Sequence, residues 1–335
     1  MPANDCKKAN MADSSIKKVA RLAGVSIATV SRCINKPEKV TEQTRIKVQS
    51  AIENTGYTPN SLAQRFRSGK THQVLVAVPS IGDPFFTKVM RGVRSAANAL
   101  GYAIVIRETR QGMMSADEIN VALESKQADG LVLLNNMTFI AGRLIGADHP
   151  HLQPPAVQID NAAAAREMTE YLIGQGHRRI GMICGRKKPS FAERERGFRK
   201  TMQKAGLKIG NSWIFDAENS LDGGRRAARQ ILECASRPTA VFCVSDELAI
   251  GCMHEFQRAG LQVPDDISVV GFDDIRYAEV TNPPLTTVRQ PAEEMGERIV
   301  RKLCAAIRDE KPDEPETQVV PHQLVIRQSV ATPRR

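Results

Sequence analysis

Hydroxyl and guanidinium side chains gather between Ser26 and Arg32, where their chemistry suits a nucleic-acid surface. The hydroxyl groups of Ser26, Thr29 and Ser31 can donate hydrogen bonds to phosphate oxygens. Arg32 can donate two parallel hydrogen bonds to the edge of a guanine, a contact worth about 1–3 kcal/mol of discrimination between bases. These residue types at this spacing predict a surface that holds a duplex and reads its sequence.

Three short helices are predicted to position these side chains. Apolar residues recur at helical spacing after Ser15, over Ile27–Ile34 and after Thr41, and Gly24 permits a sharp turn between the first two helices. Two helices joined by such a turn are typical of a helix-turn-helix, whose second helix enters the major groove. The groove-facing side of that helix is predicted to consist of Ile27, Ala28, Ser31 and Arg32.

The charge of the chain is concentrated in the same region. Among 335 residues, 47 are Lys or Arg and 37 are Asp or Glu, which gives a formal net charge of +10. Residues 1–70 contain 13 of the basic and 5 of the acidic residues, a net charge of +8, so the rest of the chain is almost neutral. A basic, helically patterned module joined to a near-neutral body indicates that the module binds a polyanion.

A second set of candidate residues follows strands that are predicted in the remainder of the chain. Apolar runs alternate there with amphipathic stretches, which predicts parallel sheets covered by helices on both faces. The predicted strands are Gln73–Pro79, Tyr102–Ile106, Gly130–Leu134, Ala156–Asp160, Ile180–Cys184, Thr239–Cys243 and Ile267–Gly271. The predicted helices include Thr87–Leu100, Ala162–Gln175 and Glu247–Ala259. Ligands of such folds bind beyond the carboxyl ends of the strands, so we expect a small-molecule site there.

Residues 16–32, with the sequence IKKVARLAGVSIATVSR, carry the most specific pattern in the chain. Together with Asn35, Val40, Thr44-Arg45 and the run Gly56-Tyr57-x-Pro59-Asn60, this pattern resembles the LacI family of bacterial transcription regulators. The resemblance extends over the whole chain. Lys18 is a departure, because the family usually has an acidic residue in this first helical turn, where it interacts favourably with the helix dipole.

The resemblance implies two folded parts joined by a hinge. An all-α helix-turn-helix module would span residues 14–59, a hinge helix residues 60–70, and an α/β two-lobe domain similar to periplasmic binding proteins residues 71–335. Lobe 1 would take residues 71–160 and 291–320, and lobe 2 residues 161–290 and 321–330. The chain would therefore cross between the lobes near Asp160, Gln290 and Val320.

By the same resemblance, a homodimer binds a pseudo-palindromic stretch of double-stranded operator DNA. The hinge helix of the family folds when two copies meet in the minor groove, and Phe66 occupies the position of its apolar wedge. An ordinary flexible linker with a buried Phe66 is the alternative. The residues expected at the DNA are Ser26, Ile27, Ala28, Thr29, Ser31, Arg32, Asn35, Asn60, Leu62, Ala63, Phe66 and Arg67.

The two-lobe domain is expected to bind a small-molecule effector between its lobes. The residues that match effector contacts of the family are Phe85, Phe86, Asp160, Arg194, Ser245 and Asp273. Aromatic rings with a guanidinium and a carboxylate suit a sugar or a nucleoside, whose binding would change operator affinity allosterically. Core packing of the two phenylalanines and a turn role for Asp273 are the alternatives. Whether the effector releases or promotes DNA binding stays open, and repression is favoured over activation.

Two departures from the family concern the effector-binding domain. Many members have an aromatic residue near Glu218 that stacks on the ligand, whereas this chain continues Glu218-Asn-Ser. The segment between Asn135 and Asp160 is shorter than in the family and contains one β-like run where two are usual, so we expect lobe 1 to lack a strand. Within the family, Val78–Phe86 and Asp129–Leu134 are most similar to the cytidine and purine repressor branch, which favours a nucleoside effector.

Three other functions compete with this interpretation. An enzyme is disfavoured because the chain has no G-x-S-x-G, H-E-x-x-H, phosphate-loop or G-x-G-x-x-G motif, although Asp246 and Asp273-Asp274 resemble a hydrolase carboxylate pair. A solute-binding protein shares the two-lobe fold but would have a signal peptide in place of a basic helical module. A nucleoid-type protein would bind DNA with a steep salt dependence and no sequence preference.

The composition also sets expectations for metal binding, cofactors, membrane association and oligomeric state. The seven cysteines show no zinc-ligand spacing, and no apolar run reaches the roughly 18 residues of a membrane span. We therefore expect a cytoplasmic protein without a metal site, a cofactor or a membrane partner. No leucine heptad follows Val325, which argues against a coiled-coil tetramer.

Overall fold

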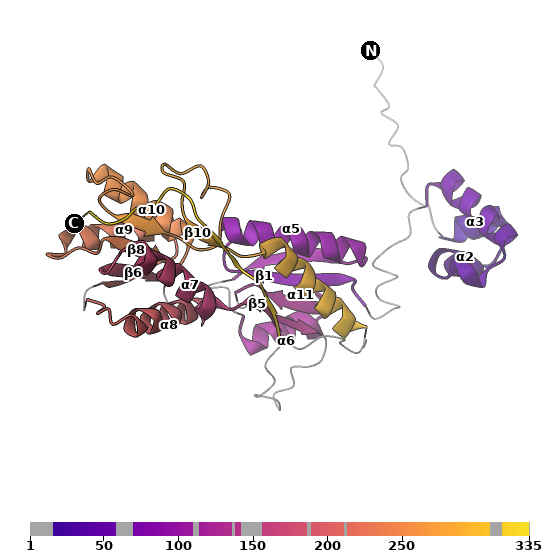
Figure 1. Cartoon of the computed structure of the whole chain (residues 1–335). Helices are drawn as coiled ribbons and strands as arrows, with labels where there is room; N and C mark the ends of the chain where they lie inside the picture. Colours follow the sequence, from indigo (N-terminus) through magenta and orange to yellow (C-terminus); the bar gives the residue numbers. More distant parts are fainter. Residues whose placement is uncertain are drawn as a thin grey trace, which may run out of the picture. The chain divides into compact units, whose positions relative to one another are not determined.

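The computed structural model describes residues 16–57, 70–109, 114–135, 138–141, 156–185, 189–210, 213–308 and 317–334. The chain divides into two compact units, Met1–Lys70 and Thr71–Arg335 (Figure 1). Asn60, Leu62, Ala63, Phe66 and Arg67 of the expected hinge lie outside the described residues.

The first unit is built from α1 (Ile16–Ala23), α2 (Ile27–Asn35), the 3-10 helix η1 (Pro37–Lys39) and α3 (Glu42–Thr55). Val19, Val30 and Val48 contribute one residue from each α-helix to its small core. Gly24 and Gly56 have φ values of +66° and +60°, a conformation that glycine adopts without a steric penalty where a helix ends. The predicted helix-turn-helix is therefore confirmed.

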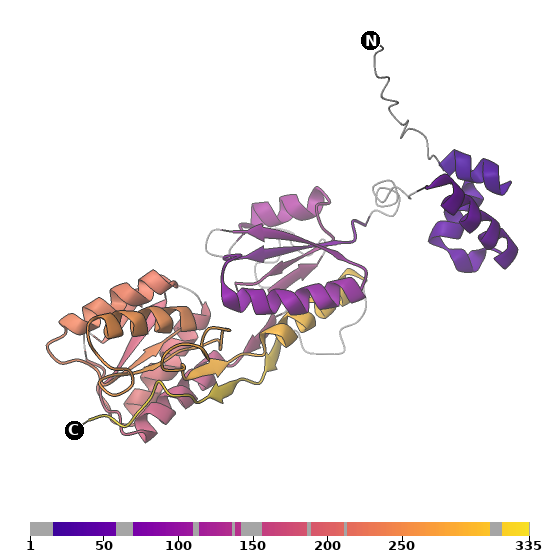
Figure 2. The ribbon, with the colours of Figure 1, turned by 90° about the horizontal axis from the view of Figure 1, so that it is seen from above.

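The second unit contains two α/β lobes (Figure 2). The sheet of lobe 1 has the strand order β11-β5-β4-β3-β1-β2. Its strands are β1 (Gln73–Val78), β2 (Ala103–Glu108), β3 (Gly130–Leu133), β4 (Thr138–Ala141), β5 (Ala156–Ile159) and β11 (Thr317–Val320). The helices α5 (Pro84–Ala99) and α11 (Ala292–Ile307) cover one face of this sheet, and α6 (Ala116–Glu124) covers the other (Figure 1).

The expectation that lobe 1 lacks a strand is wrong. β4 stands between β3 and β5 and is antiparallel to both, with Leu131 opposite Ile140. The segment that follows β3 is too short for a helical crossover, which a parallel strand at this place would require. An antiparallel strand occupies this position instead, so the sheet keeps six strands with one of opposite direction.

Lobe 2 has a four-stranded parallel sheet in the order β7-β6-β8-β9. Its strands are β6 (Ile180–Gly185), β7 (Ile214–Ala217), β8 (Ala240–Cys243) and β9 (Ser268–Val270). The helices α7 (Asn161–Gly174) and α8 (Pro189–Lys204) lie on one face, and α9 (Leu221–Glu233) and α10 (Asp246–Arg258) on the other (Figure 1). The predicted architecture of helix-covered, mainly parallel sheets is confirmed.

Three segments connect the lobes. The chain passes from β5 into α7 at Asp160, from β10 (Thr287–Arg289) into α11, and from β11 into β12 (Gln323–Val325). β10 and β12 form a separate two-stranded antiparallel sheet, with Val288 opposite Leu324. The carboxyl ends of β1, β3 and β5 in lobe 1 and of β6, β7 and β9 in lobe 2 are followed by residues that line one cavity.

Candidate functional site

The start of α2 carries the candidate DNA contacts of the first unit. Ser26 is the N-cap, and its Oγ accepts a hydrogen bond from the Thr29 backbone N–H at 3.1 Å. Ile27, Ala28 and Arg32 are exposed, and Ser31 is half-buried. Val30 and Cys33 of the same helix are buried in the core of the unit.

The exposed side of α2 therefore carries Ile27, Ala28 and Arg32 together, with Ser26 and Thr29 at its N-terminal end. Asn35 is the last residue of α2. Such a surface is shaped to place the first turns of a helix in a major groove.

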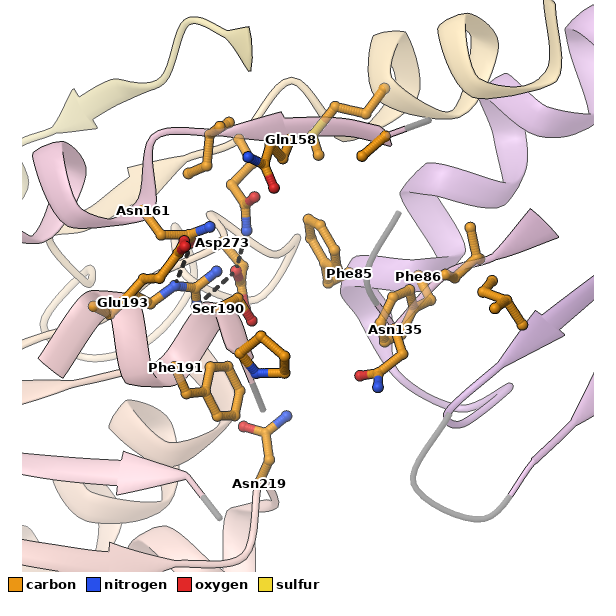
Figure 3. A pocket seen from close by; sticks show the side chains of 18 of the residues that line it. Phe85, Phe86, Asn135, Gln158, Asn161, Ser190, Phe191, Glu193, Asn219 and Asp273 are labelled. Atoms are coloured by element: carbon orange, nitrogen blue, oxygen red, sulfur yellow. Dashed lines mark hydrogen bonds and ion pairs between the residues drawn. The ribbon is translucent and has the colours of Figure 1, made fainter. Parts of the chain in front are cut away.

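A cavity of about 610 Å³ lies in the second unit, between the carboxyl ends of the two sheets. Residues from both lobes line it, including Phe85, Phe86, Asn135 and Gln158 of lobe 1 and Asn161, Phe191, Arg194, Asn219 and Asp273 of lobe 2 (Figure 3). A volume of this size holds a small organic molecule. The structure thus brings together four of the predicted effector residues, namely Phe85, Phe86, Arg194 and Asp273.

Arg194 is held rigidly in the lobe 2 side of the cavity. Its Nε donates to Asn161 Oδ1 at 2.9 Å, and its Nη1 donates to the Val244 carbonyl at 2.5 Å and lies 3.6 Å from Asp273 Oδ1. The guanidinium carbon lies 3.5 Å from the centroid of the Phe272 ring. The side chain is 4% exposed, and this burial lowers the pKa of Arg194 to about 10, so it stays positively charged at neutral pH.

Asp273 stands opposite this guanidinium on a loop of unusual conformation. Its φ value is +110°, which is rare for a residue with a side chain, and its backbone N–H donates to the Val288 carbonyl at 2.8 Å. The Asp273 carboxylate accepts a hydrogen bond from Gln290 Nε2 at 2.6 Å. Both the backbone and the side chain of Asp273 are therefore fixed by the segment that leads from β10 into α11.

Asp274, the next residue, ties the same loop to two interlobe segments. Its carboxylate accepts hydrogen bonds from Arg289 at 2.6 Å and from Arg327 at 2.7 Å. Burial acts to raise the pKa of Asp274, but the hydrogen bonds from the two arginines outweigh it and hold that pKa below its usual range. The backbone carbonyl of Asp274 accepts a hydrogen bond from Lys88 Nζ on α5, so the loop also contacts lobe 1 directly.

Asp246 lies behind this loop as a structural carboxyl group. It is completely buried, and it accepts hydrogen bonds from Thr287 Oγ1 at 2.6 Å and from the Ile275 N–H at 2.8 Å. Burial, with a contribution from the negative charge of Asp273, raises the pKa of Asp246 well above its usual range. Asp246 therefore supports the loop and does not line the cavity.

Phe85 and Phe86 lie in the first turn of α5, which begins at Pro84 after the N-cap Asp83. Their ring centroids are 5.3 Å apart in an edge-to-face arrangement. Phe86 is 7% exposed and packs into the core, whereas Phe85 is half-buried and presents more of its ring to the cavity (Figure 3).

The other two predicted effector residues are helix caps that do not line the cavity. Asp160 is the N-cap of α7, and its carboxylate accepts from the Ala163 N–H at 2.8 Å. Ser245 is the N-cap of α10 and donates to Asn219 Oδ1. Ser245 thus touches a residue that lines the cavity without lining it itself.

Several residues of the cavity are not among the predicted effector contacts. Asn161, with Asp160, was recognised as a polar residue beyond the end of a predicted strand, and the same rule could have found Asn135 and Asn219 after β3 and β7. Phe191 also follows a strand, but it lies in the first turn of α8, six residues beyond the end of β6.

The geometry therefore defines a class of protein. A helix-turn-helix unit with an exposed, polar recognition surface is followed in one chain by a two-lobe α/β unit with a ligand-sized cavity. Among the described residues, no helix is long and apolar enough to cross a membrane, and no group of His, Cys, Asp and Glu side chains is placed to bind a metal ion. This combination is that of a ligand-regulated DNA-binding protein.

Comparison with known proteins identifies the family. Residues 15–60 match the model of bacterial regulatory proteins of the lacI family, and residues 169–330 match a periplasmic binding protein-like domain. The chain is 36% identical over 296 residues to the HTH-type transcriptional repressor CytR of Escherichia coli strain K12, covering 84% of this chain and 86% of that protein.

Solved structures agree with this assignment. The lac repressor dimer bound to operator and the anti-inducer ONPF matches with a TM-score of 0.80 and 25% identity, over 95% of this chain and 99% of that chain. A complex of the transcriptional regulator CelR with cellobiose matches with a TM-score of 0.66 and 29% identity, over 95% of this chain and 100% of that chain. The chain belongs to the LacI family and is a DNA-binding transcription regulator with an effector-binding domain.

Proposed function

We propose that this chain represses transcription as a homodimer on a pseudo-palindromic operator and that a sugar or nucleoside in the 610 Å³ cavity sets its operator affinity. The observation that carries the proposal is the loop Asp273-Asp274. Asp273 lines the cavity and is hydrogen-bonded to Gln290, between β10 and α11, and Asp274 is hydrogen-bonded to Arg289 of β10 and to Arg327 after β12. The relatives named above as repressors support it.

The DNA-binding half of the proposal rests on α2. Two recognition helices of a dimer enter successive major grooves, and Arg32 reads a base while Ser26, Thr29 and Ser31 bond phosphates. Residues 14–59 form the DNA-binding domain, and residues 60–70 form a hinge helix that contacts the minor groove. Asn60, Leu62, Ala63 and Arg67 position the hinge, Phe66 is its wedge, and Asn35 adds a contact at the end of α2.

The effector-binding half rests on charge and aromatic contacts in residues 71–335. Arg194 and Asp273 supply a fixed donor and acceptor for ligand hydroxyl groups, and Phe85 packs on an apolar face of the ligand. Phe86 supports Phe85, Ser245 holds Asn219, and Asp160 anchors α7 beside the cavity residue Asn161.

Coupling between the two halves follows from the contacts of the loop. A ligand that binds Asp273 shifts a residue that is hydrogen-bonded to Gln290, between β10 and α11. The next residue, Asp274, is hydrogen-bonded to Arg289 of β10 and to Arg327 after β12. Lys88 joins the same loop to α5 of lobe 1. Ligand binding therefore favours one lobe orientation over another, which is the two-state element that an allosteric response requires.

The test begins with operators selected from random duplexes and with a thermal-shift screen of sugars, nucleosides and purines. A compound that binds the folded state raises the melting temperature, and it should also change operator affinity in a fluorescence anisotropy titration. Asp273→Ala should lose the response to that compound while operator affinity without the compound stays within about twofold, a change below roughly 0.5 kcal/mol.

Asp222→Ala is the matched control, because Asp222 is exposed on α9 and does not line the cavity. It should respond as the unchanged protein does. A chain that prefers no duplex sequence, or an Asp273→Ala variant with a normal response, contradicts the proposal.

A further inference from the structure

We infer that Phe191 is the lobe 2 aromatic contact of the effector site and that, with Phe85 of lobe 1, it selects a ligand with a planar ring, a nucleoside in preference to a simple sugar. The inference rests on the proposed function, because it assumes that the cavity binds the effector. In the family pattern, the aromatic residue that stacks on the ligand lies on the segment after β7. The inference assigns this contact to α8 instead.

Phe191 lies in the wall of the cavity, where its ring is almost completely buried and fixed by its neighbours. It lies in the first turn of α8, lines the cavity and is 7% exposed. A Cβ atom placed on Gly185 would come within 2.3 Å of the Phe191 ring, so the ring rests directly on the glycine backbone at the end of β6. The Arg194 guanidinium carbon lies 5.3 Å from the ring centroid on another side. The ring is thus held in one orientation before any ligand arrives.

Phe85 supplies a second ring from the opposite lobe. It projects from the start of α5 toward the cavity, whereas Phe191 approaches from the lobe 2 side, two residues after Pro189 (Figure 3). Phe86 packs edge-to-face against Phe85 and limits its movement. A flat ligand ring that enters the cavity can therefore contact an aromatic side chain of each lobe.

In many members of the family, an aromatic residue near position 218 stacks on the ligand, but this chain continues Glu218-Asn-Ser. Asn219, which follows β7, lines the cavity, and its Oδ1 accepts a hydrogen bond from Ser245. This bond directs the amide group and leaves no aromatic surface on that segment. Phe191 is the residue on the lobe 2 side that restores such a surface among the described lining residues.

The polar rim of the cavity favours a nucleobase as the planar ring. The lining includes the amide side chains of Asn135, Gln158, Asn161, Asn219 and Gln290. Asn161 and Asn219 each use the side-chain oxygen, and Gln290 the side-chain nitrogen, in bonds within the protein. The amide groups of Asn135 and Gln158 can present a donor and an acceptor side by side, which is the pattern that pairs with the edge of a base. Arg194 and Asp273 remain for the hydroxyl groups of the attached sugar.

The experiment compares adenosine and cytidine with ribose, which has the hydroxyl groups but no base. The full-length protein is titrated with each compound by calorimetry and thermal shift. At least one nucleoside should bind, and ribose should bind at least about tenfold more weakly, because base stacking on an aromatic side chain contributes that much or more. Phe191→Leu, which keeps the apolar volume, should weaken nucleoside binding by about tenfold and leave ribose binding unchanged.

Phe198→Leu is the matched control, since Phe198 is a fully buried residue of the same helix that does not line the cavity. It should keep the preference for the nucleoside even if it lowers the melting temperature. Phe191→Trp adds an indole beside the ligand, and its fluorescence should be quenched by the bound nucleoside. The natural protein is the reference, because its single tryptophan, Trp213, donates to the Ser236 carbonyl and does not line the cavity.

Failure of the proposed effector site and failure of the role of Phe191 would give different results. If no nucleoside or sugar raises the melting temperature of the natural protein, the proposed effector site itself fails. If a nucleoside binds the natural protein and Phe191→Leu equally, or if a simple sugar binds at least as tightly as any nucleoside, the effector site stands and the role of Phe191 is overturned.

Discussion

The two units of this protein use arginine in opposite ways. Arg32 of the first unit is exposed in the last turn of α2. Arg194 of the second unit is 4% exposed and is bonded to Asn161, Val244 and Asp273. An exposed arginine can contact a partner as large as a duplex, whereas a buried arginine with fixed bonds is already oriented for a small ligand.

The difference extends to other titratable groups. Residues 1–70 contain no histidine and have a net charge of +8, and the Lys and Arg side chains among residues 16–57 are exposed. The second unit buries Asp246, Asp274 and His177 along with Arg194. Changes to charge in the first unit should therefore alter binding with little effect on folding, and changes in the second unit should alter both.

Replacing Arg194 by alanine should have the largest effect on stability. The substitution removes one member of a buried ion pair and leaves the Asp273 carboxylate and the Val244 carbonyl without this donor, which typically costs about 3–5 kcal/mol. Urea unfolding followed by Trp213 fluorescence measures it, because this single tryptophan belongs to the second unit. Arg196→Ala in the same helix is the control, since Arg196 is 67% exposed and should change the free energy of unfolding by less than about 0.5 kcal/mol. Equal losses in the two variants would contradict the distinction between buried and exposed arginines.

Acid should destabilise the second unit through His177. This side chain is 1% exposed, its Nδ1 lies 2.9 Å from Thr239 Oγ1, and burial lowers its pKa to about 4. Because the unfolded chain binds a proton near pH 6.5 and the folded chain does not, this stabilising contribution is present above pH 6.5 and is lost as the pH falls toward 4.

The loss amounts to about 3 kcal/mol over that interval. The measurement is the free energy of unfolding of the natural protein and of His177→Asn at pH 7 and pH 4.5, again by Trp213 fluorescence. The natural protein should lose more stability on acidification than the variant, and parallel losses would mean that His177 is not the group that titrates.

Much of this fold could be predicted because most of its strands are apolar runs of the sequence. β1, β2, β3, β5, β6, β8 and β9 each match a predicted strand within two residues at either end, although β2 is largely exposed, whereas β7 and β11 were not predicted. β10 and β12 were missed because each has only three residues, too few for an apolar run to stand out in the sequence. β4 was missed because its antiparallel direction depends on the length of the connection and not on its side chains.

Fewer residues of the candidate site could be predicted from the sequence, because their roles depend on backbone geometry and tertiary contacts. Asp160 and Asp273 both follow a strand, yet Asp160 caps a helix while Asp273 faces the cavity. The backbone decides between these roles, since Asp160 has an extended conformation and Asp273 has a φ value of +110°. Phe191 depends in turn on the closeness of Gly185, a tertiary contact that residue types alone do not reveal.

Replacing Arg32 by alanine should change DNA recognition without changing stability. The loss of a bidentate base contact should reduce the preference for the selected operator over an unrelated duplex by about 1–3 kcal/mol. Anisotropy titrations against both duplexes at several salt concentrations measure this preference. Binding to the unrelated duplex depends on phosphate contacts, so the slope of its affinity against salt concentration should change little in the variant. If Arg32→Ala keeps the full preference, α2 is not the recognition helix.

Ser26 offers the smallest expected effect and separates two roles of one side chain. Its Oγ caps α2 through the Thr29 N–H and is also proposed to meet a phosphate. Ser26→Ala loses the cap and should cost about 1 kcal/mol of stability, seen as faster hydrogen exchange of the α2 amides. Ser26→Asp keeps a capping oxygen and adds a favourable charge at the helix N-terminus, so the first unit should remain stable. The same carboxylate repels a phosphate, so Ser26→Asp should bind every duplex more weakly than Ser26→Ala does. If Ser26→Asp binds DNA as well as the natural protein, Ser26 is a cap alone, and the phosphate contacts of this unit lie elsewhere.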